Sequence, residues 1–330
     1  MTLLFSQAIQ LFFTDYLPEQ RNTSPCTLRA YRDCIRLFLS YASQATGKPP
    51  ERMGFPDISA SLVLEFLAHL EKERHNSIRT RNLRLAAIRT LMRYMVRNCP
   101  ENMHTAQGIL AIPFKRCDHP LMTFLTKEEM TAILSAPSAD TWSGRRDRVM
   151  LRTLYNTGAR VSEIAGLRVS AIDAVGKPVI NLLGKGRKER AVPIWKETAS
   201  QIRAWVAENK LQSSDALFQN REGGAISRSG VEKRLKIAVA SASRAVPSIA
   251  KKRVSPHTFR HSLAMHMLQS GIDLSVIALW LGHEKLESTH RYLEADMKMK
   301  ESALKTTNGC KGRLERYRPG DTLMRFLQGL

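Results

Sequence analysis

The sequence predicts a mainly α-helical protein of two domains, with a β-hairpin in the second domain. Its 330 residues exceed the usual size of one compact domain. Apolar residues recur at helical spacing through the first third of the chain, which indicates amphipathic helices. In the second half, the strand-like segments Pro178–Leu183 and Arg190–Ile194 flank a glycine-containing turn, which predicts the hairpin.

The first domain is expected over residues 1–105 and consists of helices. Serines open three of them, because a serine side chain accepts hydrogen bonds from the unpaired amides of a helix N-terminus. Pro18 interrupts the first helical pattern. The predicted helices cover residues 4–17, begin at Ser24-Pro25 and at Ser59, and span Ser77–Asn98.

The fourth helix, Ser77–Asn98, carries a row of arginines. It contains no acidic residue, so the arginines form no salt-bridge ladder within the helix. Arg89, Arg93 and Arg97 repeat at i, i+4 and i+8 and line one face. A solvated basic face is the simpler alternative, whereas the total charge of the chain favours contact with DNA phosphates. The DNA-binding candidates are Arg79, Arg81, Arg84, Arg89, Arg93 and Arg97.

A linker is expected over residues 106–120, where prolines and a glycine accompany weak periodicity. The second domain, residues 121–305, begins with Thr126-Lys-Glu-Glu129, a capping box before a helix. A later helix, Arg146–Asn156, ends at Gly158, and a new one starts at once with Arg160. A strand is also predicted over Ser170–Ala174 and a helix over Arg228–Ala242.

The stretch Ser255–Tyr292 joins a strong helix start to residues that suit a phosphate. Ser255 can cap the helix, and Pro256 takes its first position. His257 and Arg260 are three apart, so they share one face near the positive end of the helix dipole. Such a helix start is a good place to hold a phosphate.

Further residues extend this set. A short helix is predicted over Leu274–Leu281, and it ends at Gly282 before His283. Tyr292 follows nine residues later. In the hairpin turn, glycines flank Lys185 on both sides, so this lysine lies at a tip from which it can reach outward. The set suits an attack by tyrosine on a phosphodiester.

Cleavage of a phosphodiester by a side-chain nucleophile needs three contributions. The nonbridging oxygens of the pentavalent state must be neutralised, which suits arginine because each guanidinium grips two oxygens. A tyrosine can be the nucleophile, and its phenolate leaves again readily, so the phosphoester bond is conserved. A lysine can protonate the departing 5′ oxygen. No acidic cluster of the two-metal type stands out, so we expect no metal and no cofactor.

The composition agrees with a DNA partner. The formal net charge is +21, which predicts salt-sensitive binding to a polyanion. The alternatives are a basic protein that is merely soluble and one that contacts an anionic membrane. Five cysteines, never spaced as CxxC, indicate neither a disulfide framework nor a zinc site. The chain shows no basic leader and no apolar run that spans a bilayer, so we expect a cytoplasmic protein without a membrane partner.

Five motifs resemble those of the tyrosine recombinases, the phage-integrase and Xer-type family. Their order and spacing match across roughly Thr126 to Ala303, and the basic helical first domain resembles the family's core-binding (SAM-like) domain. The motifs are highly specific together, although HxxR or GKG alone is weak. They are Ala159-Arg160-Val161-Ser162-Glu163, Gly184-Lys185-Gly186-Arg187-Lys188-Glu189-Arg190, Pro256-His257-Thr258-Phe259-Arg260-His261, Leu281-Gly282-His283 and Tyr292.

The resemblance implies a fold, an activity and an assembly. The catalytic domain would be mainly helical with a small antiparallel β-sheet. The protein would be a site-specific recombinase or integrase that cleaves and rejoins double-stranded DNA through a 3′-phosphotyrosine intermediate. It would act as a homotetramer on two DNA sites during synapsis. The motifs do not distinguish integration from excision, dimer resolution or transposon movement.

The resemblance also implies residue roles at the phosphate. Arg160 and Arg260 would bind the scissile phosphate, with His257 assisting. Glu163 would support Arg160 and would not be a catalyst. Without the other motifs, Arg160 reads as an ordinary arginine at a helix start that pairs with Glu163.

Three further roles concern protons and the nucleophile. By resemblance, Lys185 would be the general acid, and His283 would orient or deprotonate the nucleophile. Tyr292 would form the 3′-phosphotyrosine link. The later Tyr317 is the alternative nucleophile, although no histidine stands at family spacing from it. Other basic residues of the turn compete with Lys185, and two histidines on the helix of His257 are expected to pack or to face solvent. These residues are Arg187, Lys188 and Arg190, and His261 and His266.

Two other functions and one unassigned segment remain. A type IB topoisomerase uses similar phosphotyrosine chemistry on a single duplex. A catalytically silent DNA-binding regulator is opposed by the sequence, because no catalytic-type position is visibly replaced. The tail, residues 306–330, combines a polar connector with the apolar end Leu323–Leu327, which could dock on a neighbouring subunit or on its own domain.

Overall fold

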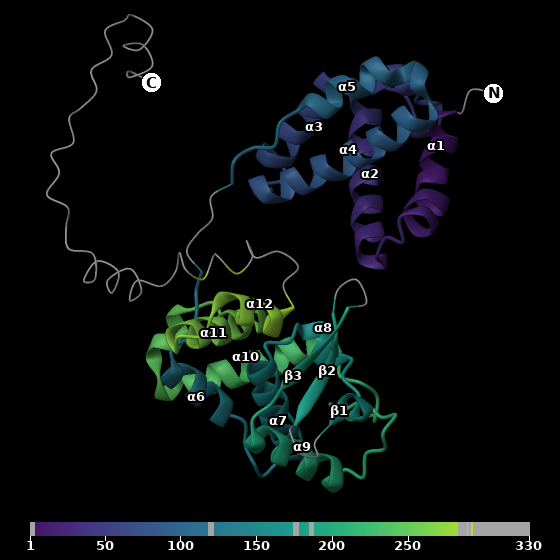
Figure 1. The fold of residues 1–330 in the computed structure, drawn as a ribbon. Coiled ribbons are helices and arrows are strands. Elements are labelled where there is room, and N and C mark those ends of the chain that lie inside the picture. Colours follow the sequence, from purple (N-terminus) through teal and green to yellow (C-terminus); the bar gives the residue numbers. More distant parts are fainter. Residues whose placement is uncertain are drawn as a thin grey trace, which may run out of the picture. The chain divides into compact units, whose positions relative to one another are not determined.

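The computed structural model describes residues 4–117, 122–173, 178–184 and 188–282, together with Thr289 and Tyr292. The chain divides into two compact units, Met1–Pro120 and Leu121–Leu330 (Figure 1). Each unit has its own hydrophobic core. Within the described ranges, no helix has both the length and the apolar character that crossing a bilayer requires.

The described residues of the first unit form helices and the turns between them. The serine caps are confirmed, because Ser24, Ser59 and Ser77 each accept a hydrogen bond from the backbone amide three residues later. The helices are α1 (Phe5–Leu11), η1 (Phe12–Gln20), α2 (Pro25–Thr46), η2 (Pro50–Arg52), η3 (Phe55–Asp57), α3 (Ala60–Lys72), α4 (Ile78–Asn98), η4 (Pro100–Asn102) and α5 (Met103–Ala111).

The structure differs from the sequence prediction at two places in this unit. The first helix continues past Pro18 to Gln20 as the π-helix η1. Proline has no amide hydrogen, and its ring clashes with the preceding turn of an α-helix, so α geometry is lost here while helical winding continues. At the other end, α5 extends to Ala111 although a linker is predicted from residue 106. Only Ala106 and Ile109 of α5 are buried, too few for a helical period to stand out.

Helix α4 packs its apolar side into the core of the first unit. Leu85, Ile88, Met92 and Met95 are buried, as the periodicity predicts. The remaining sides of α4 therefore carry most of its arginines toward the surface.

The second unit combines helices with a three-stranded antiparallel sheet of order β1-β2-β3. Its helices are α6 (Lys127–Ser135), α7 (Trp142–Thr157), α8 (Val161–Ala165), η5 (Val169–Ala171), α9 (Lys196–Glu208), α10 (Arg228–Ala245), η7 (Pro247–Lys251), α11 (Pro256–Gln269) and α12 (Leu274–Leu281). Its strands are β1 (Ile172–Asp173), β2 (Val179–Leu183) and β3 (Glu189–Pro193).

The predicted hairpin is confirmed. Strands β2 and β3 pair antiparallel with Leu183 opposite Glu189, and the amide of Gly184 donates to the carbonyl of Lys188 at 2.8 Å. The predicted strand at Ser170–Ala174 is shorter in the structure, where η5 takes its first residues and β1 keeps two.

The turn between α7 and α8 packs against α11 and α12 in a way that requires glycine. Gly158 has a φ of +58°, and a Cβ at this position would lie 2.5 Å from Leu281 Cδ2 and 2.9 Å from Leu263 Cδ2. A side chain therefore meets both backbone strain and steric overlap there. Because the turn packs against α11, Arg160, two residues after Gly158, lies near Arg260 of that helix.

Gly158→Ala should lower the free energy of unfolding of the second unit by about 2–5 kcal/mol, since left-handed backbone costs a side chain about 1–2 kcal/mol and overpacking adds about 1–3 kcal/mol. The matched control is Gly271→Ala, because Gly271 has a φ of +81° but no atom within 4 Å of the added Cβ. Urea unfolding measures both. Equal losses for the two variants would contradict the packing argument.

Candidate active site

Arg260 is a buried cation that connects three segments of the second unit. It lies in the second turn of α11 and is 4% exposed. Its Nη1 donates to the carbonyl of Gly158 at 2.6 Å, and its Nη2 donates to the carbonyl of Leu281 at 2.5 Å. Burial and then the neighbouring Arg160 lower the pKa of Arg260 to about 10, against the opposing effect of Tyr292. The guanidinium is still charged at neutral pH.

Arg160 is held at the start of α8 by Glu163. The amide of Arg160 donates to Glu163 Oε2 at 2.8 Å, and its Nη1 donates to Oε1 at 2.9 Å. The Glu163 side chain is 3% exposed and that of Arg160 is 30% exposed. The predicted pairing of a helix-start arginine with Glu163 is therefore present in the structure, and part of the Arg160 side chain reaches solvent.

Glu163 also binds Arg190 of β3, a residue that the sequence prediction considered only as a competitor of Lys185. Nη1 and Nη2 of Arg190 donate to the two carboxylate oxygens at 3.0 and 2.7 Å. Burial raises the pKa of Glu163, but hydrogen bonds from Arg190 and from Arg160 outweigh it and hold that pKa below its ordinary value. The sequence does carry a signal for Arg190, because it shares the inward face of β3 with the buried Val192.

Tyr292 lies against α11. Its side chain is 1% exposed, and its hydroxyl lies 3.2 Å from Nδ1 of His261. His261 was expected to pack or to face solvent, and it does pack, with its ring edge-on to that of Tyr292. His257 is exposed, and its ring stacks on that of His261 with centroids 6.5 Å apart. His261 follows His257 by four residues, so the spacing on the helix could have placed both on the face near the tyrosine.

His266 has a structural role, as the sequence predicts. Its Nε2 lies 2.9 Å from the carbonyl of Leu125, and its Nδ1 lies 2.7 Å from the hydroxyl of Tyr155. A carbonyl only accepts, so Nε2 carries the hydrogen and the tyrosine donates to Nδ1. Burial lowers the pKa of His266 and raises that of Tyr155 to about 12.

Of the predicted catalytic set, Arg160 and Tyr292 lie near Arg260, and His257 stacks on the His261 that contacts Tyr292. Lys185 and His283 lie outside the described residues, as do Tyr317 and the tail 306–330.

The predicted DNA-binding arginines of α4 divide by burial. Arg81 is buried, its Nη1 donates to the carbonyl of Pro113 at 3.2 Å, and its Nε lies 3.5 Å from the Glu71 carboxylate. Direct phosphate contact does not fit this position, because the guanidinium is used inside the unit. Arg84 donates to a carbonyl of α2 at 3.5 Å, and Arg89 lies over the ring of Phe114 at 4.9 Å. The exposed members are Arg79, Arg93 and Arg97.

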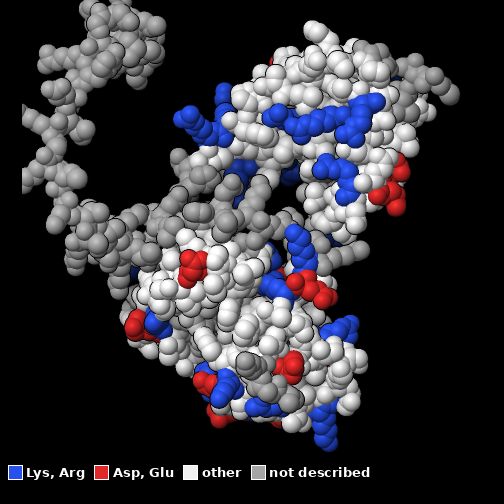
Figure 2. Space-filling view, in the orientation of Figure 1, with Lys and Arg blue, Asp and Glu red and all other residues white. Residues whose placement is uncertain are grey.

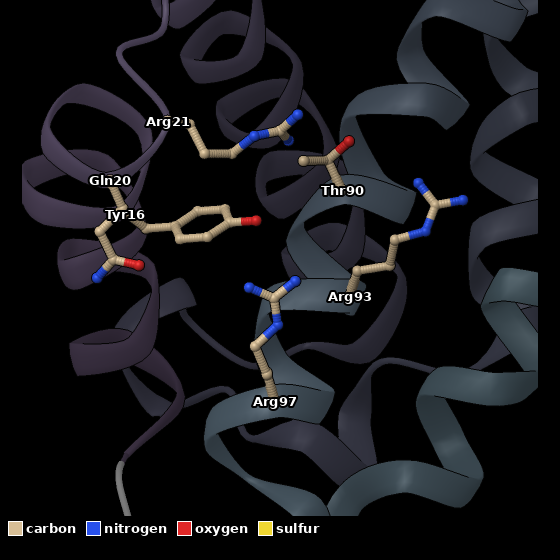
Figure 3. A pocket seen from close by; sticks show the side chains of 6 residues that line it. All are labelled: Tyr16, Gln20, Arg21, Thr90, Arg93 and Arg97. Carbon is tan, nitrogen blue, oxygen red and sulfur yellow. The ribbon is translucent and has the colours of Figure 1, made fainter.

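Arg93 and Arg97 line a pocket of about 440 Å³ between η1 and α4 (Figure 3). Arg21, which sequence reasoning missed, comes from the end of η1, and Tyr16 lies between Arg21 and Arg97 with its ring centroid 5.9 and 5.8 Å from their guanidinium carbons. The remaining lining residues are Gln20 and Thr90. In the part of the chain that the structure describes, none of these three arginines has an ion pair. Basic side chains outnumber acidic ones on the visible face of this unit (Figure 2).

Comparison with known proteins assigns each unit to a known domain family. The Phage integrase family matches residues 123–299, and the Phage integrase N-terminal SAM-like domain matches residues 11–98. The chain is 42% identical over 322 residues to y4rC of Sinorhizobium fredii, whose name describes an integrase/recombinase, with 98% of this chain and 97% of that protein covered. It is 33% identical over 286 residues to tyrosine recombinase XerC of Pelobacter propionicus, covering 86% and 90%.

Solved structures share the fold. The XerH site-specific recombinase bound to palindromic difH substrate, in a post-cleavage complex, matches with a TM-score of 0.67 at 24% identity, over 91% of this chain and 83% of that one. A λ integrase tetramer bound to a Holliday junction matches with a TM-score of 0.62 at 14% identity, over 88% and 77%.

These matches define the class of enzyme, one that breaks and rejoins DNA strands by tyrosine-type chemistry. The chain belongs to the phage integrase family and is a site-specific tyrosine recombinase that acts on DNA. The predictions of this family, of a mainly helical fold and of a SAM-like first domain are confirmed.

Glu163→Gln should destabilise the second unit at neutral pH by about 1–3 kcal/mol, because two arginines lose a charged acceptor. The pKa of Glu163 is lowered in the folded protein, so its contribution is present above its ordinary value of 4.5 and is lost as pH falls through the folded value. Urea unfolding from about pH 7 down to about pH 3 should therefore show the two proteins converging. Glu232→Gln, at an exposed position of α10, is the control. A difference that stays constant with pH would refute the assignment.

Proposed function

We propose that this recombinase acts on double-stranded DNA through a 3′-phosphotyrosine intermediate at Tyr292. The observation that carries the proposal is the position of Tyr292 against α11, where its hydroxyl lies 3.2 Å from Nδ1 of His261. The proposed nucleophile thus contacts the residue that directly follows the buried Arg260 on the helix. The first unit would bind the DNA core site, and the second unit would carry the chemistry.

The two arginines of the second unit suit the scissile phosphate. A guanidinium has five N–H donors, and the carbonyls of Gly158 and Leu281 use two of those of Arg260. Arg160 spends its Nη1 on Glu163 and has a side chain that is 30% exposed. Both therefore retain donors for the nonbridging oxygens, whose charge grows in the pentavalent state. The exposed His257 in the first turn of α11 can add a third contact.

The proposed chemistry exchanges one phosphoester bond for another. The Tyr292 oxygen bonds to phosphorus, and the bond from phosphorus to the 5′ oxygen breaks. The phenol proton passes to a histidine, for which His283 is the candidate by family resemblance and His261 is the one in contact here. Lys185 gives a proton to the 5′ oxygen. Attack by another 5′ hydroxyl reverses these steps, so that the strands rejoin without an external energy source.

DNA phosphates are proposed to contact the first unit at its exposed arginines. Arg93 and Arg97 share their pocket with Arg21, and a phosphate there would supply the acceptor that these cations lack among the described residues. The carboxylate of Asp15, the residue before Tyr16, already accepts a hydrogen bond from the side chain of Gln20 at 2.7 Å. Arg79, at the start of α4, extends the basic surface.

Assembly is proposed to be a homotetramer on two DNA sites, working in the cytoplasm where the DNA is held. The λ integrase tetramer on a Holliday junction, which has the same fold, supports this proposal. The tail, residues 306–330, is the candidate for a contact between subunits.

Tyr292→Phe should leave DNA binding within about threefold of wild type and abolish the covalent protein–DNA adduct, because only the hydroxyl reacts. The lost hydrogen bond to His261 costs about 0.5–1.5 kcal/mol, so the variant should fold. Denaturing gels of a nicked substrate detect the adduct. The matched control is Tyr155→Phe, which loses a similar bond to His266 and should still form the adduct. An adduct with Tyr292→Phe would disprove the assignment and direct attention to Tyr317.

Replacement of Arg21, Arg93 and Arg97 by alanine should weaken DNA binding and reduce its salt dependence. Each lost phosphate contact lowers the slope of log affinity against log salt by about 0.9, so the triple variant should lose roughly 2–3 units. Titrations at several salt concentrations give the slope. Arg32→Ala removes an arginine that already pairs with Asp33 at 3.0 Å and should change the slope little. An unchanged slope in the triple variant would mean that DNA does not reach the pocket.

A further inference from the structure

Arg190 joins three parts of the candidate active site. Its Nη1 and Nη2 bind both oxygens of Glu163, and its Nε donates to the carbonyl of Trp280 at 3.2 Å. Glu163 in turn holds Arg160. The Arg190 side chain is 11% exposed. One guanidinium therefore connects strand β3, the start of α8 and the last turn of α12.

Two glycines beside Arg190 directly precede the remaining candidate residues. Gly184 comes before Lys185, and a Cβ on Gly184 would lie 3.5 Å from Nη1 of Arg190. Gly282 comes before His283 and has a φ of +64°; a Cβ there would lie 3.0 Å from Cδ of Arg190 and 3.4 Å from its Nε. The backbone that leads into both residues thus packs against one arginine side chain.

Arg190 is not suited to be the general acid. A guanidinium stays protonated across the pH range of a folded protein, so it has no proton to give. Its Nε, Nη1 and Nη2 also already donate to the carbonyl of Trp280 and the carboxylate of Glu163. Its influence must pass through the groups that it binds.

The carboxylate of Glu163 carries one negative charge, which two arginines share. Without Arg190, both carboxylate oxygens could bind Arg160 in a bidentate pair. Such a pair would cancel the charge of Arg160 and occupy the N–H groups that a phosphate needs. With Arg190 in place, the guanidinium of Arg160 uses only Nη1 on Glu163, in addition to the bond from its backbone amide, and keeps its remaining guanidinium donors.

We propose that Arg190 is a positioning residue for DNA cleavage. By binding both oxygens of Glu163 it leaves Arg160 available to the scissile phosphate. Its packing against Gly184 and Gly282 holds the Arg190 side chain in place for this role. This inference rests on the proposed function, because it takes the scissile phosphate as the ligand of Arg160.

The test compares Arg190→Lys and Arg190→Met with the same changes at Arg146. Arg146 is a close match, because its Nε and Nη2 bind Asp147 at 3.0 and 2.7 Å and its Nη1 binds the carbonyl of Gln219 at 2.9 Å. Arg146 is also buried. It lies near the start of α7, at the opposite end of that helix from Gly158 and the candidate active site. Both pairs of variants therefore remove a buried arginine from a carboxylate.

With full-length protein in saturating excess over a nicked DNA substrate, both Arg190 variants should form the covalent adduct about 10- to 100-fold more slowly than wild type. Their DNA affinity should stay within about threefold, since Arg190 makes no proposed DNA contact. The Arg146 variants should lose comparable thermal stability and retain the wild-type rate. Arg190→Lys keeps the charge and provides a folded variant if Arg190→Met does not fold.

A pH profile separates positioning from packing. The charged groups around Glu163 are Arg160, Arg190 and Arg260. Arg190→Met removes a cation and hydrogen-bond donor that lowers the pKa of Glu163, so that pKa rises. Cleavage by Arg190→Met should therefore decline at a higher pH than cleavage by wild type as the solution is acidified.

A double variant closes the test. If Arg190 acts through Glu163, then Arg190→Lys should slow cleavage little further in a Glu163→Gln background. Multiplicative losses, a decline of Arg190→Met cleavage at the same acidic pH as wild type, or equal losses in the Arg190 and Arg146 variants would overturn the inference. Absence of an adduct with wild type would instead refute the proposed function, so the two failures are distinguishable.

Discussion

A charged guanidinium can stay out of water only where its N–H groups find acceptors, and Arg260 finds them at the ends of two helices. Gly158 caps α7, and Leu281 is the last residue of α12. The final carbonyls of a helix have no partner within it and carry the negative end of its dipole. Arg260 satisfies one carbonyl at each end. The bond to Gly158 fixes α11 against the turn that leads to Arg160, and the bond to Leu281 fixes α11 against α12.

This arrangement concentrates positive charge. Arg160, Arg190 and Arg260 lie around the single carboxylate of Glu163, and burial already lowers the pKa of Arg260 to about 10. Repulsion among these cations costs stability in the free protein, and in the proposed function an anionic phosphate among them would remove that cost. Because the cations are held by backbone carbonyls and a buried carboxylate, they would need little rearrangement when charge develops on the phosphate oxygens. The same reasoning applies more loosely to the exposed arginines of the first unit, which lack this support.

Local features of the fold were predictable from the sequence, and contacts between distant segments mostly were not. The caps at Ser24, Ser77 and Ser255 follow from a side chain and an amide three residues apart, so they need no tertiary information. The role of Arg190 depends on where Glu163 lies after folding. Arg81 is instructive, because it precedes Leu85 by four residues and Ile88 by seven and so falls on the apolar stripe of α4. The helical periodicity of α4 therefore predicts that Arg81 is buried, although the net charge of the chain favours a contact between Arg81 and DNA.

The central claim is that Arg160 and Arg260 neutralise the nonbridging oxygens of the phosphate that Tyr292 attacks. It can be tested most directly by chemical change of the DNA. A methylphosphonate at the scissile position replaces one charged oxygen by a methyl group and so removes the need for one cation. With the ordinary phosphate, Arg160→Ala should cleave about 10²- to 10³-fold more slowly than wild type. With the methylphosphonate, the loss should shrink to about tenfold or less. An equal loss on both substrates would show that Arg160 does not act on the charge of this phosphate.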